Sequence, residues 1–363
     1  MGVPGKIPYL CMDTGKEIHN FHKKWRHVYE GLRPCAKTAL VRPDRPAMTA
    51  QQYEDALSEY KGLYVAMQEL HIFFDVIAQE NLALTGDNGG LRRYEVIILP
   101  HLGELGQKEV DHLDCWVEAG GRIFATGSSG TKAGGTVQLK SLPFSRERAV
   151  ISKKELLFSS YIAPEQTNEK PGHYNGPVIS LYGSYHLFEW KENTRGRYKM
   201  LARAPFAPPE KAHGNVQINE RGIGIGDYGK GKGIVIPLTI GRGYREIGLK
   251  CYRDLFEELL REEGAVQEPV TVEIAKQVGV TVNTNGAKTV IYLINMSGAR
   301  RQNFGTHLPI EGGKVRLAKQ GNFKVYTLKT FAEYEVKDGI VELPTLDLYE
   351  VVVVEDLNVT DIS

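Results

Sequence analysis

Side chains suited to nucleophilic chemistry gather in residues 125–130, which read Ala-Thr-Gly-Ser-Ser-Gly. This segment follows an apolar run, and a sharp strand-to-loop turn there would present Ser128 or Ser129 above a sheet. Acyl transfer by a serine also needs a histidine base with an acid behind it. No histidine can be assigned to that role from its spacing, so the pattern favours a loop that simply turns, and we assign no catalytic residue.

A second glycine-rich string, residues 224–229, has the spacing G-x-G-x-x-G of a dinucleotide-binding loop. Phosphate binding requires such a string to follow a strand and to open a helix whose N-terminus holds the anion. Here the string runs into Gly-Lys-Gly-Ile-Val-Ile at residues 231–236, which is typical of another strand. We therefore interpret residues 224–236 as a hairpin, and we expect no cofactor.

Two other chemistries are considered and set aside. His19, His22 and His27 have helical spacing that would suit a metal site. No acidic residue or cysteine occupies a matching position, and Lys23 and Lys24 crowd the same surface, so we expect solvated histidines and no metal. Glycoside hydrolysis needs two positioned carboxylates. With 44 acidic residues in the chain, the sequence alone nominates no pair.

The elements that would position these segments alternate between strands and helices. Apolar runs indicate buried strands, and amphipathic segments indicate helices, the first of which has Thr49 at its cap position. Because each crossover must pass over the sheet, this alternation predicts a parallel sheet covered on both faces. The predicted fold class is α/β, with a flavodoxin-like doubly wound sheet. The expected strands are residues 35–41, 72–77, 94–100 and 121–126, and the expected helices are residues 51–70 and 108–119.

The pattern of residue types changes in the remainder of the chain. Residues 141–217 form an irregular insertion that the pattern does not place, and residues 247–263 are predicted to form one helix that closes the first domain. From residue 269 onward, β-branched residues alternate with turns, and Asn285-Gly286 between two such runs is a strong hairpin signal. We therefore expect an N-terminal linker and helix at 1–34, an α/β domain at 35–266 and a small all-β sandwich at 267–363.

An open parallel sheet places its ligand site at the carboxyl ends of its strands. On this analogy, the candidate ligand-binding residues are His101, Ser128, Ser129 and Asp227, the last of which lies in the glycine-rich hairpin. An enzyme or a sugar-binding protein that uses this cleft is one of two functions that the sequence leaves open.

Composition excludes several classes of partner. The 45 basic and 44 acidic residues give a net charge of +1, which provides no field to recruit nucleic acid or an anionic membrane. No segment has the length and apolarity of a membrane helix or a signal peptide, so we expect a cytoplasmic location. The four cysteines form no CxxC pair, and we interpret them as free thiols.

Several stretches together resemble the trimerisation domain of family 42 β-galactosidases and related glycoside hydrolases. The resemblance implies a class I glutamine amidotransferase-like fold that lacks amidotransferase activity. Its later stretches look like the C-terminal portions of those chains, so that it spans nearly the whole sequence. The stretches are residues 39–41, 60–64, 72–76, 91–100, 116–127, 236–244, 290–298 and 343–355.

Two departures from these families shape the expected function. Amidotransferases carry a cysteine at the strand-to-loop elbow, whereas residues 127–129 here are Gly-Ser-Ser and the nearest cysteine, Cys115, lies in the preceding helix. The family also carries a catalytic (β/α)8 barrel upstream, which this sequence does not contain. The resemblance thus implies a non-catalytic oligomerisation or accessory protein. It would form a homo-oligomer, with a trimer possible, or would dock on a barrel subunit, and a carbohydrate is a further possible ligand.

Overall fold

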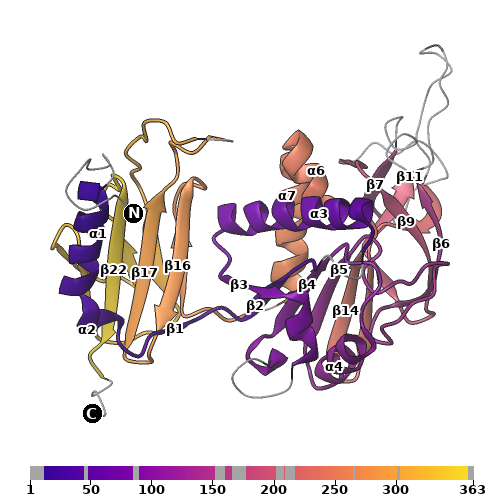
Figure 1. Ribbon diagram of the computed structural model, residues 1–363, viewed down its shortest axis with the longest axis horizontal. Coiled ribbons are helices and arrows are strands. Elements are labelled where there is room, and N and C mark those ends of the chain that lie inside the picture. Colours follow the sequence, from indigo (N-terminus) through magenta and orange to yellow (C-terminus); the bar gives the residue numbers. More distant parts are fainter. Residues whose placement is uncertain are drawn as a thin grey trace, which may run out of the picture. The chain divides into compact units, whose positions relative to one another are not determined.

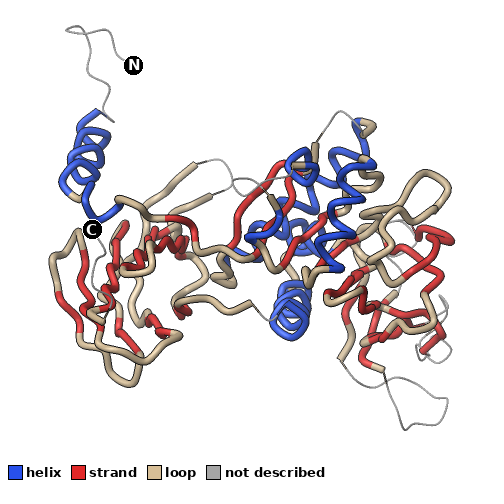
Figure 2. The backbone as a smooth tube through the Cα atoms, turned by 90° about the horizontal axis from the view of Figure 1, so that it is seen from below, coloured by secondary structure: helices blue, strands red, loops and turns tan. Residues whose placement is uncertain are grey.

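The computed structural model describes residues 12–44, 48–84, 90–151, 160–165, 177–201, 208, 217–264, 266–300 and 303–358. The chain divides into two compact units. Unit 2 comprises Ala36–Glu268, and unit 1 comprises the residues before and after it (Figure 1). Helices gather around the sheet of unit 2, whereas unit 1 consists mostly of strands (Figure 2). No helix among the described residues is long and apolar enough to cross a membrane.

Unit 2 is built around a seven-stranded sheet. Strands β14, β5, β4, β2 and β3 run parallel, and β13 and β10 add antiparallel neighbours at one side. The sheet order is β10 (Arg195–Gly196), β13 (Gly224–Tyr228), β14 (Gly231–Ile236), β5 (Arg122–Thr126), β4 (Val96–Pro100), β2 (Thr38–Arg42) and β3 (Phe74–Ala78). As the sequence predicts, β13 and β14 form a hairpin in which Tyr228 pairs with Gly231.

Helices cover both faces of this sheet because successive side chains of a strand point to opposite sides. Ile98 joins a core with Leu63 of α3 and Phe256 of α7, whereas Ile97 joins a second core with Leu113 of α4. The covering helices are α3 (Ala50–Glu69), α4 (Gln107–Glu118), α6 (Ile240–Ile247) and α7 (Lys250–Leu259), with short helical turns η1 (Gln79–Ala83), η2 (Leu91–Arg93) and η3 (Leu260–Gly264). The prediction of an α/β sheet covered by helices on both faces is confirmed.

The helix predicted for residues 247–263 is confirmed from Lys250 onward, as α7 followed directly by η3, but its predicted start is wrong. Gly248 adopts a left-handed conformation (φ 67°) and ends α6, so that α7 begins afresh at Lys250. Glycine tolerates this backbone because it has no Cβ, which makes it a common helix terminator.

The described part of the predicted insertion forms two small antiparallel sheets and contributes β10 to the seven-stranded sheet. Strand β6 pairs with β9, and the other sheet has the order β12, β11, β7 and β8. Parts of the interval 141–217 lie outside the described residues. The strands are β6 (Phe144–Ile151), β7 (Tyr161–Pro164), β8 (Ile179–Ser180), β9 (Tyr185–Trp190), β11 (Tyr198–Leu201) and β12 (Gln217–Arg221).

Unit 1 contains two antiparallel sheets and the N-terminal helices. A six-stranded sheet has the order β1, β16, β17, β22, β19 and β20, and a three-stranded sheet has the order β15, β18 and β21. The predicted Asn285-Gly286 hairpin is confirmed: it joins β16 to β17, and Gly286 has a φ of 94°. The elements are α1 (Met12–Lys24), α2 (Arg26–Tyr29), β1 (Arg33–Pro34), β15 (Val270–Glu273), β16 (Val278–Thr284), β17 (Lys288–Asn295), β18 (Lys314–Leu317), β19 (Phe323–Thr327), β20 (Glu333–Tyr334), β21 (Ile340–Glu342) and β22 (Tyr349–Asp356).

Candidate functional site

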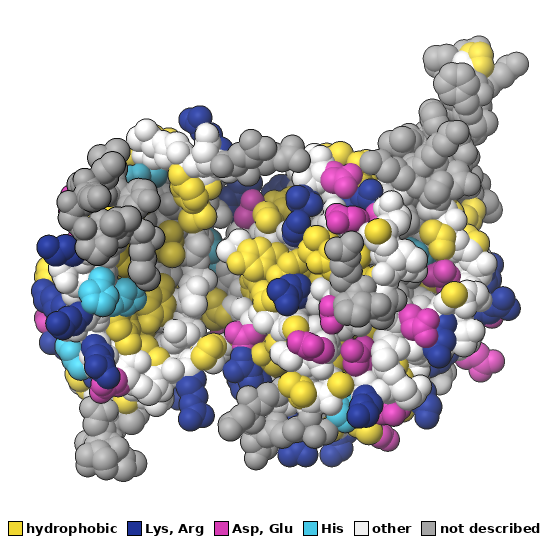
Figure 3. Space-filling view, viewed as in Figure 1, with side chains coloured by type: hydrophobic (Ala, Val, Ile, Leu, Met, Phe, Trp, Pro, Cys, Tyr) yellow, Lys and Arg dark blue, Asp and Glu magenta, His cyan; other side chains and the backbone are white. Residues whose placement is uncertain are grey.

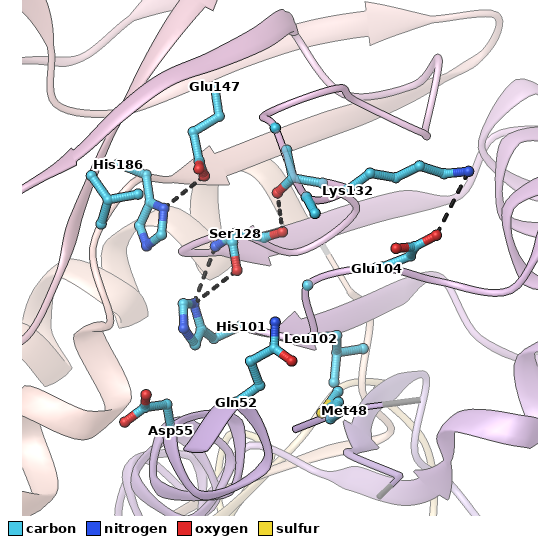
Figure 4. A pocket seen from close by; sticks show the side chains of 15 residues that line it. Met48, Gln52, Asp55, His101, Leu102, Glu104, Ser128, Lys132, Glu147 and His186 are labelled. Carbon is cyan, nitrogen blue, oxygen red and sulfur yellow. Dashed lines mark hydrogen bonds and ion pairs between the residues drawn. The ribbon is translucent and has the colours of Figure 1, made fainter. Parts of the chain in front are cut away.

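A pocket of about 380 Å³ opens at the carboxyl ends of β4 and β5 in unit 2. His101 follows β4 directly, and Ser128 follows β5 after one intervening glycine. The first half of α3 supplies Gln52 and Asp55, and β6 and β9 of the insertion cover the opposite side (Figure 4). This position is the one that the strand-end rule predicts.

Gly127 occupies the strand-to-loop elbow after β5. It has a φ of 54°, and a Cβ built on it would lie 2.1 Å from Nδ1 of His101. His101 has a φ of 53°, and its ring fills the space that a side chain at position 127 would need. A side chain at position 127 would meet both a disfavoured backbone conformation and a direct steric clash.

His101 is held as a neutral imidazole. The backbone N–H of Ser128 donates to its Nδ1 at 3.1 Å, which fixes the ring proton on Nε2. Burial, with smaller contributions from His186 and Arg242, lowers the pKa of His101 to about 3. The ring is therefore uncharged at neutral pH, and it is too weak a base to activate a serine.

The two predicted serines have different surroundings. Ser128 lines the pocket, with its Oγ 3.4 Å from Nδ1 of His101. Ser129 is buried, and its one hydroxyl hydrogen is shared between the carbonyl oxygens of Leu99 at 2.7 Å and Thr126 at 3.0 Å, while its oxygen accepts from the N–H of Leu102 at 3.0 Å. Ser129 thus ties the loops after β4 and β5 together, and its hydroxyl is committed to that task.

Asp227 does not line this pocket. It sits on β13 opposite Lys232, and Lys232 in turn pairs with Arg122 at the amino end of β5. Its largely exposed carboxylate approaches Arg195 at 3.7 Å. The structure therefore brings His101 and Ser128 together at the pocket but places Asp227 at the other end of the sheet.

Two residues that the sequence did not single out, Glu147 and His186, complete the pocket. Nδ1 of the buried His186 lies 2.8 Å from Oε2 of Glu147, and its Nε2 lies 3.2 Å from Oγ of Ser184. The ring of His186 is 5.4 Å from that of His101, centroid to centroid. No local signal links residues that are 39 positions apart; they meet because β6 and β9 pair, with Val150 opposite His186.

The series Ser184, His186 and Glu147 has the hydroxyl–imidazole–carboxylate order of a hydrolase triad. Ser184 is not among the residues that line the pocket, so its hydroxyl does not face a substrate bound there. We assign these contacts to holding the ring of His186 in place.

No cluster that could hold a metal ion is found among the described residues. His19, His22 and His27 lie exposed on α1 and α2. The carboxylates of the pocket are Asp55, Glu104 and Glu147.

No protein-family model and no curated protein matches the sequence. Among solved structures, α-L-fucosidase isoenzyme 2 from Paenibacillus thiaminolyticus is 18% identical with a TM-score of 0.68, and the match covers 93% of this chain and 51% of that one. A GH42 β-galactosidase from G. stearothermophilus is 19% identical with a TM-score of 0.61, covering 95% and 43%. A β-galactosidase from Bacillus circulans sp. alkalophilus is 15% identical with a TM-score of 0.63, covering 97% and 46%.

The chain thus spans about half the length of these solved structures. The expected likeness to family 42 β-galactosidases and related glycoside hydrolases is confirmed for the fold. This chain shares the fold of part of these glycoside hydrolases.

Proposed function

We propose that this chain is a non-hydrolytic assembly portion of a glycoside hydrolase, which associates with copies of itself, as a trimer, and acts beside a hydrolytic barrel. In this proposal unit 2 is a flavodoxin-like, class I amidotransferase-like domain without amidotransferase activity, unit 1 is an accessory β-sandwich, and the protein acts in the cytoplasm. The catalytic carboxylates of glycoside hydrolysis belong to the barrel.

The observation that carries the non-catalytic assignment is the filled elbow. An amidotransferase needs a cysteine nucleophile at this elbow, whereas residues 127–129 here are Gly-Ser-Ser, and the ring of His101 lies where a side chain at position 127 would go. His101 itself has a pKa of about 3, which makes it unsuited to general base catalysis near neutral pH. The likeness in fold to part of several glycosidases supports placing the chain beside a barrel.

A surface of unit 2 supports self-association. Strand β3 ends the seven-stranded sheet, and the side chains of Val76 on β3 and Val65 on α3 are 43% and 38% exposed. Tyr64 packs edge-on against Phe74 nearby, with ring centroids 5.3 Å apart. Hydrophobic side chains gather around α3 on the face shown in Figure 3. An edge strand with apolar neighbours is a ready surface for a second copy.

Light scattering coupled to size-exclusion chromatography tests self-association directly. We expect the full chain to elute as a trimer, and we expect Val65→Glu to shift it toward the monomer because a carboxylate in an apolar contact is costly to desolvate. The matched control is Val178→Glu, since Val178 is 40% exposed and lies outside α3 and β3. A wild-type chain that stays monomeric at all concentrations would contradict self-association.

Activity measurements separate the assembly role from an enzymatic one. The purified chain should hydrolyse neither glutamine nor a panel of aryl glycosides. Material recovered from native extract should be active on aryl glycosides only when a barrel-sized partner is present. Hydrolysis by the purified chain alone would contradict the non-hydrolytic assignment.

A further inference from the structure

The pocket beside His101 and Ser128 has the size of a ligand site that the assembly role does not use. Its volume of about 380 Å³ lies within the range of roughly 300–1,000 Å³ that is usual for small-molecule sites. It is formed by three separate parts of unit 2: the strand-end loops after β4 and β5, the first half of α3, and the β6–β9 pair. Its walls are therefore fixed by packed elements on several sides.

The charges of the pocket are already paired within the protein. Asp55 contacts Nη1 of Arg242 at 2.8 Å, and Glu147 contacts His186 at 2.8 Å. Glu104 lies 3.6 Å from Nζ of Lys132. Asp55 and Glu104 thus each have a cationic neighbour and Glu147 has an imidazole partner, so that no lining carboxylate is left without a partner in the protein. The carboxylates also disfavour an anion, because a like charge in a partly enclosed site is repelled.

Hydrogen-bonding capacity nevertheless remains. An ionised carboxylate has about four acceptor sites on its two oxygens, and a single neighbour does not use them all. The Ser128 hydroxyl adds a donor at the pocket wall. A wall that offers both acceptors and a donor suits a ligand that can both donate and accept, and a hydroxyl group does both.

The pocket also has an apolar side. Met48 and Leu102 lie next to each other on one side of it, whereas Glu147 and His186 lie on the opposite side (Figure 4). A ring that carries hydroxyl groups on its edge and C–H bonds on its face would meet both sides with matching chemistry.

We propose that this pocket binds a small uncharged polyhydroxylated ring, of the size of a monosaccharide, and holds its hydroxyl groups against Glu147, Ser128 and Asp55. This goes beyond the assembly role, because the pocket lies after β4 and β5 whereas the self-association surface lies on β3 and α3. It makes the chain a sugar-binding subunit in addition to an assembly subunit, and no covalent step is involved.

Isothermal titration of the full-length protein with a charge-matched panel tests the ligand class. The probes are the neutral sugars D-glucose, D-galactose and L-fucose, the anion D-galacturonate and the cation D-galactosamine. We expect at least one neutral sugar to bind, and we expect galacturonate to bind at least about tenfold more weakly than galactose. If none of the neutral sugars binds, or if galacturonate or galactosamine binds most tightly, the proposal is overturned.

Two variants test the location. Glu147→Gln keeps the shape of the side chain but replaces one acceptor oxygen with a donor, and we expect it to weaken sugar binding at least about tenfold. Its control is Glu189→Gln, an exposed carboxylate on the neighbouring strand β9 that does not line the pocket, which should leave the affinity unchanged. Equal affinity of Glu147→Gln and wild type would overturn the assigned contact.

Ala133→Trp tests the same site by steric filling. Ala133 is exposed on the loop that lines the pocket, so an indole there should block the ligand while leaving the thermal unfolding midpoint close to that of the wild type. The control is Ala119→Trp, at the C-terminus of α4, where an equally large side chain should not affect binding. Full sugar affinity in Ala133→Trp would place the ligand elsewhere and overturn the proposal.

Discussion

Glu59, one helical turn beyond Asp55 on α3, is a fully buried carboxyl group with a defined structural task. Its Oε2 accepts a hydrogen bond from the backbone N–H of Arg242 at 2.7 Å, in the first turn of α6. The residue before that helix, Thr239, makes no side-chain cap of its own, so Glu59 caps α6 from another helix. Burial raises the pKa of Glu59 to about 7, and the hydrogen bonds and Arg242 offset part of this effect.

The pKa of Glu59 predicts a dependence of stability on pH. An unfolded chain releases this proton near pH 4.5, whereas the folded protein holds it to about pH 7, so the folded state binds more protons between these values. The free energy of unfolding should therefore fall as pH rises through this window, by on the order of 3 kcal/mol from this group.

Urea unfolding of Glu59→Gln between pH 4.5 and pH 8 checks this component. The glutamine keeps an acceptor for the N–H of Arg242 but does not titrate, so the variant should lose this part of the pH dependence and should gain stability relative to wild type as pH rises. The control is Glu54→Gln, an exposed residue on the same helix, which should keep the wild-type slope. An identical slope in Glu59→Gln and wild type would contradict the assigned pKa.

Helices α3 and α6 approach each other through two glycines. A Cβ on Gly62 would lie 1.8 Å from the carbonyl oxygen of Gly241, and a Cβ on Gly241 would lie 2.4 Å from the carbonyl oxygen of Glu59. This close crossing is what brings Glu59 to the first turn of α6. The sequence pattern predicts α3 and its cap, and Thr49 indeed accepts from the N–H of Gln52, but the helical period does not reveal Gly62 as the crossing point.

Gly62→Ala should therefore be strongly destabilising although alanine favours helices. The methyl group meets backbone atoms, which cannot turn away as a side chain can, and we expect a loss of at least about 3 kcal/mol. The matched substitution is Gly15→Ala in α1, where nothing lies within 4 Å of the added Cβ. It should stabilise slightly, by about 0.5–1 kcal/mol. Thermal unfolding measures the stability of both variants. A Gly62→Ala variant as stable as the wild type would contradict the close crossing of α3 and α6.

The two ends of the chain share one unit. Val28 of α2 is buried in one cluster with Val290 of β17, Val351 and Val353 of β22, and Leu328, which follows β19. Strand β1 extends the same sheet, with Arg33 opposite Thr284. An N-terminal segment that the sequence describes only as a linker and helix is therefore part of the core of unit 1, because it covers apolar side chains that the sheet presents on that face.

Hydrogen exchange followed by mass spectrometry tests this division across the whole molecule. Val28→Ala should cost about 1–3 kcal/mol and speed amide exchange in the strands of unit 1, while unit 2 keeps its wild-type protection. Leu113→Ala, which removes a fully buried side chain of α4, should speed amide exchange in unit 2 while unit 1 keeps its wild-type protection. Faster exchange throughout the chain in Val28→Ala would show that the two units unfold together.

Local features of the sequence are enough to predict many of the elements. Apolar runs, the Thr49 cap, the Asn285-Gly286 turn and the glycine-rich hairpin each act over a few residues, and the structure confirms the cap, the turn and the hairpin. The strand-end rule also located His101 and Ser128 at one pocket, because parallel strands bring their carboxyl ends to the same edge.

Contacts between segments that are distant in sequence are seen only in the folded structure. Glu147 and His186 contact each other only through the pairing of β6 with β9, and Asp227 falls at the far end of the sheet because β13 runs antiparallel to β14. The ring of His101 fills the elbow at Gly127 from a different strand. The periodicity of apolar residues and the turn residues predict which element a segment forms. Strand order and register depend instead on packing between segments that are distant in sequence.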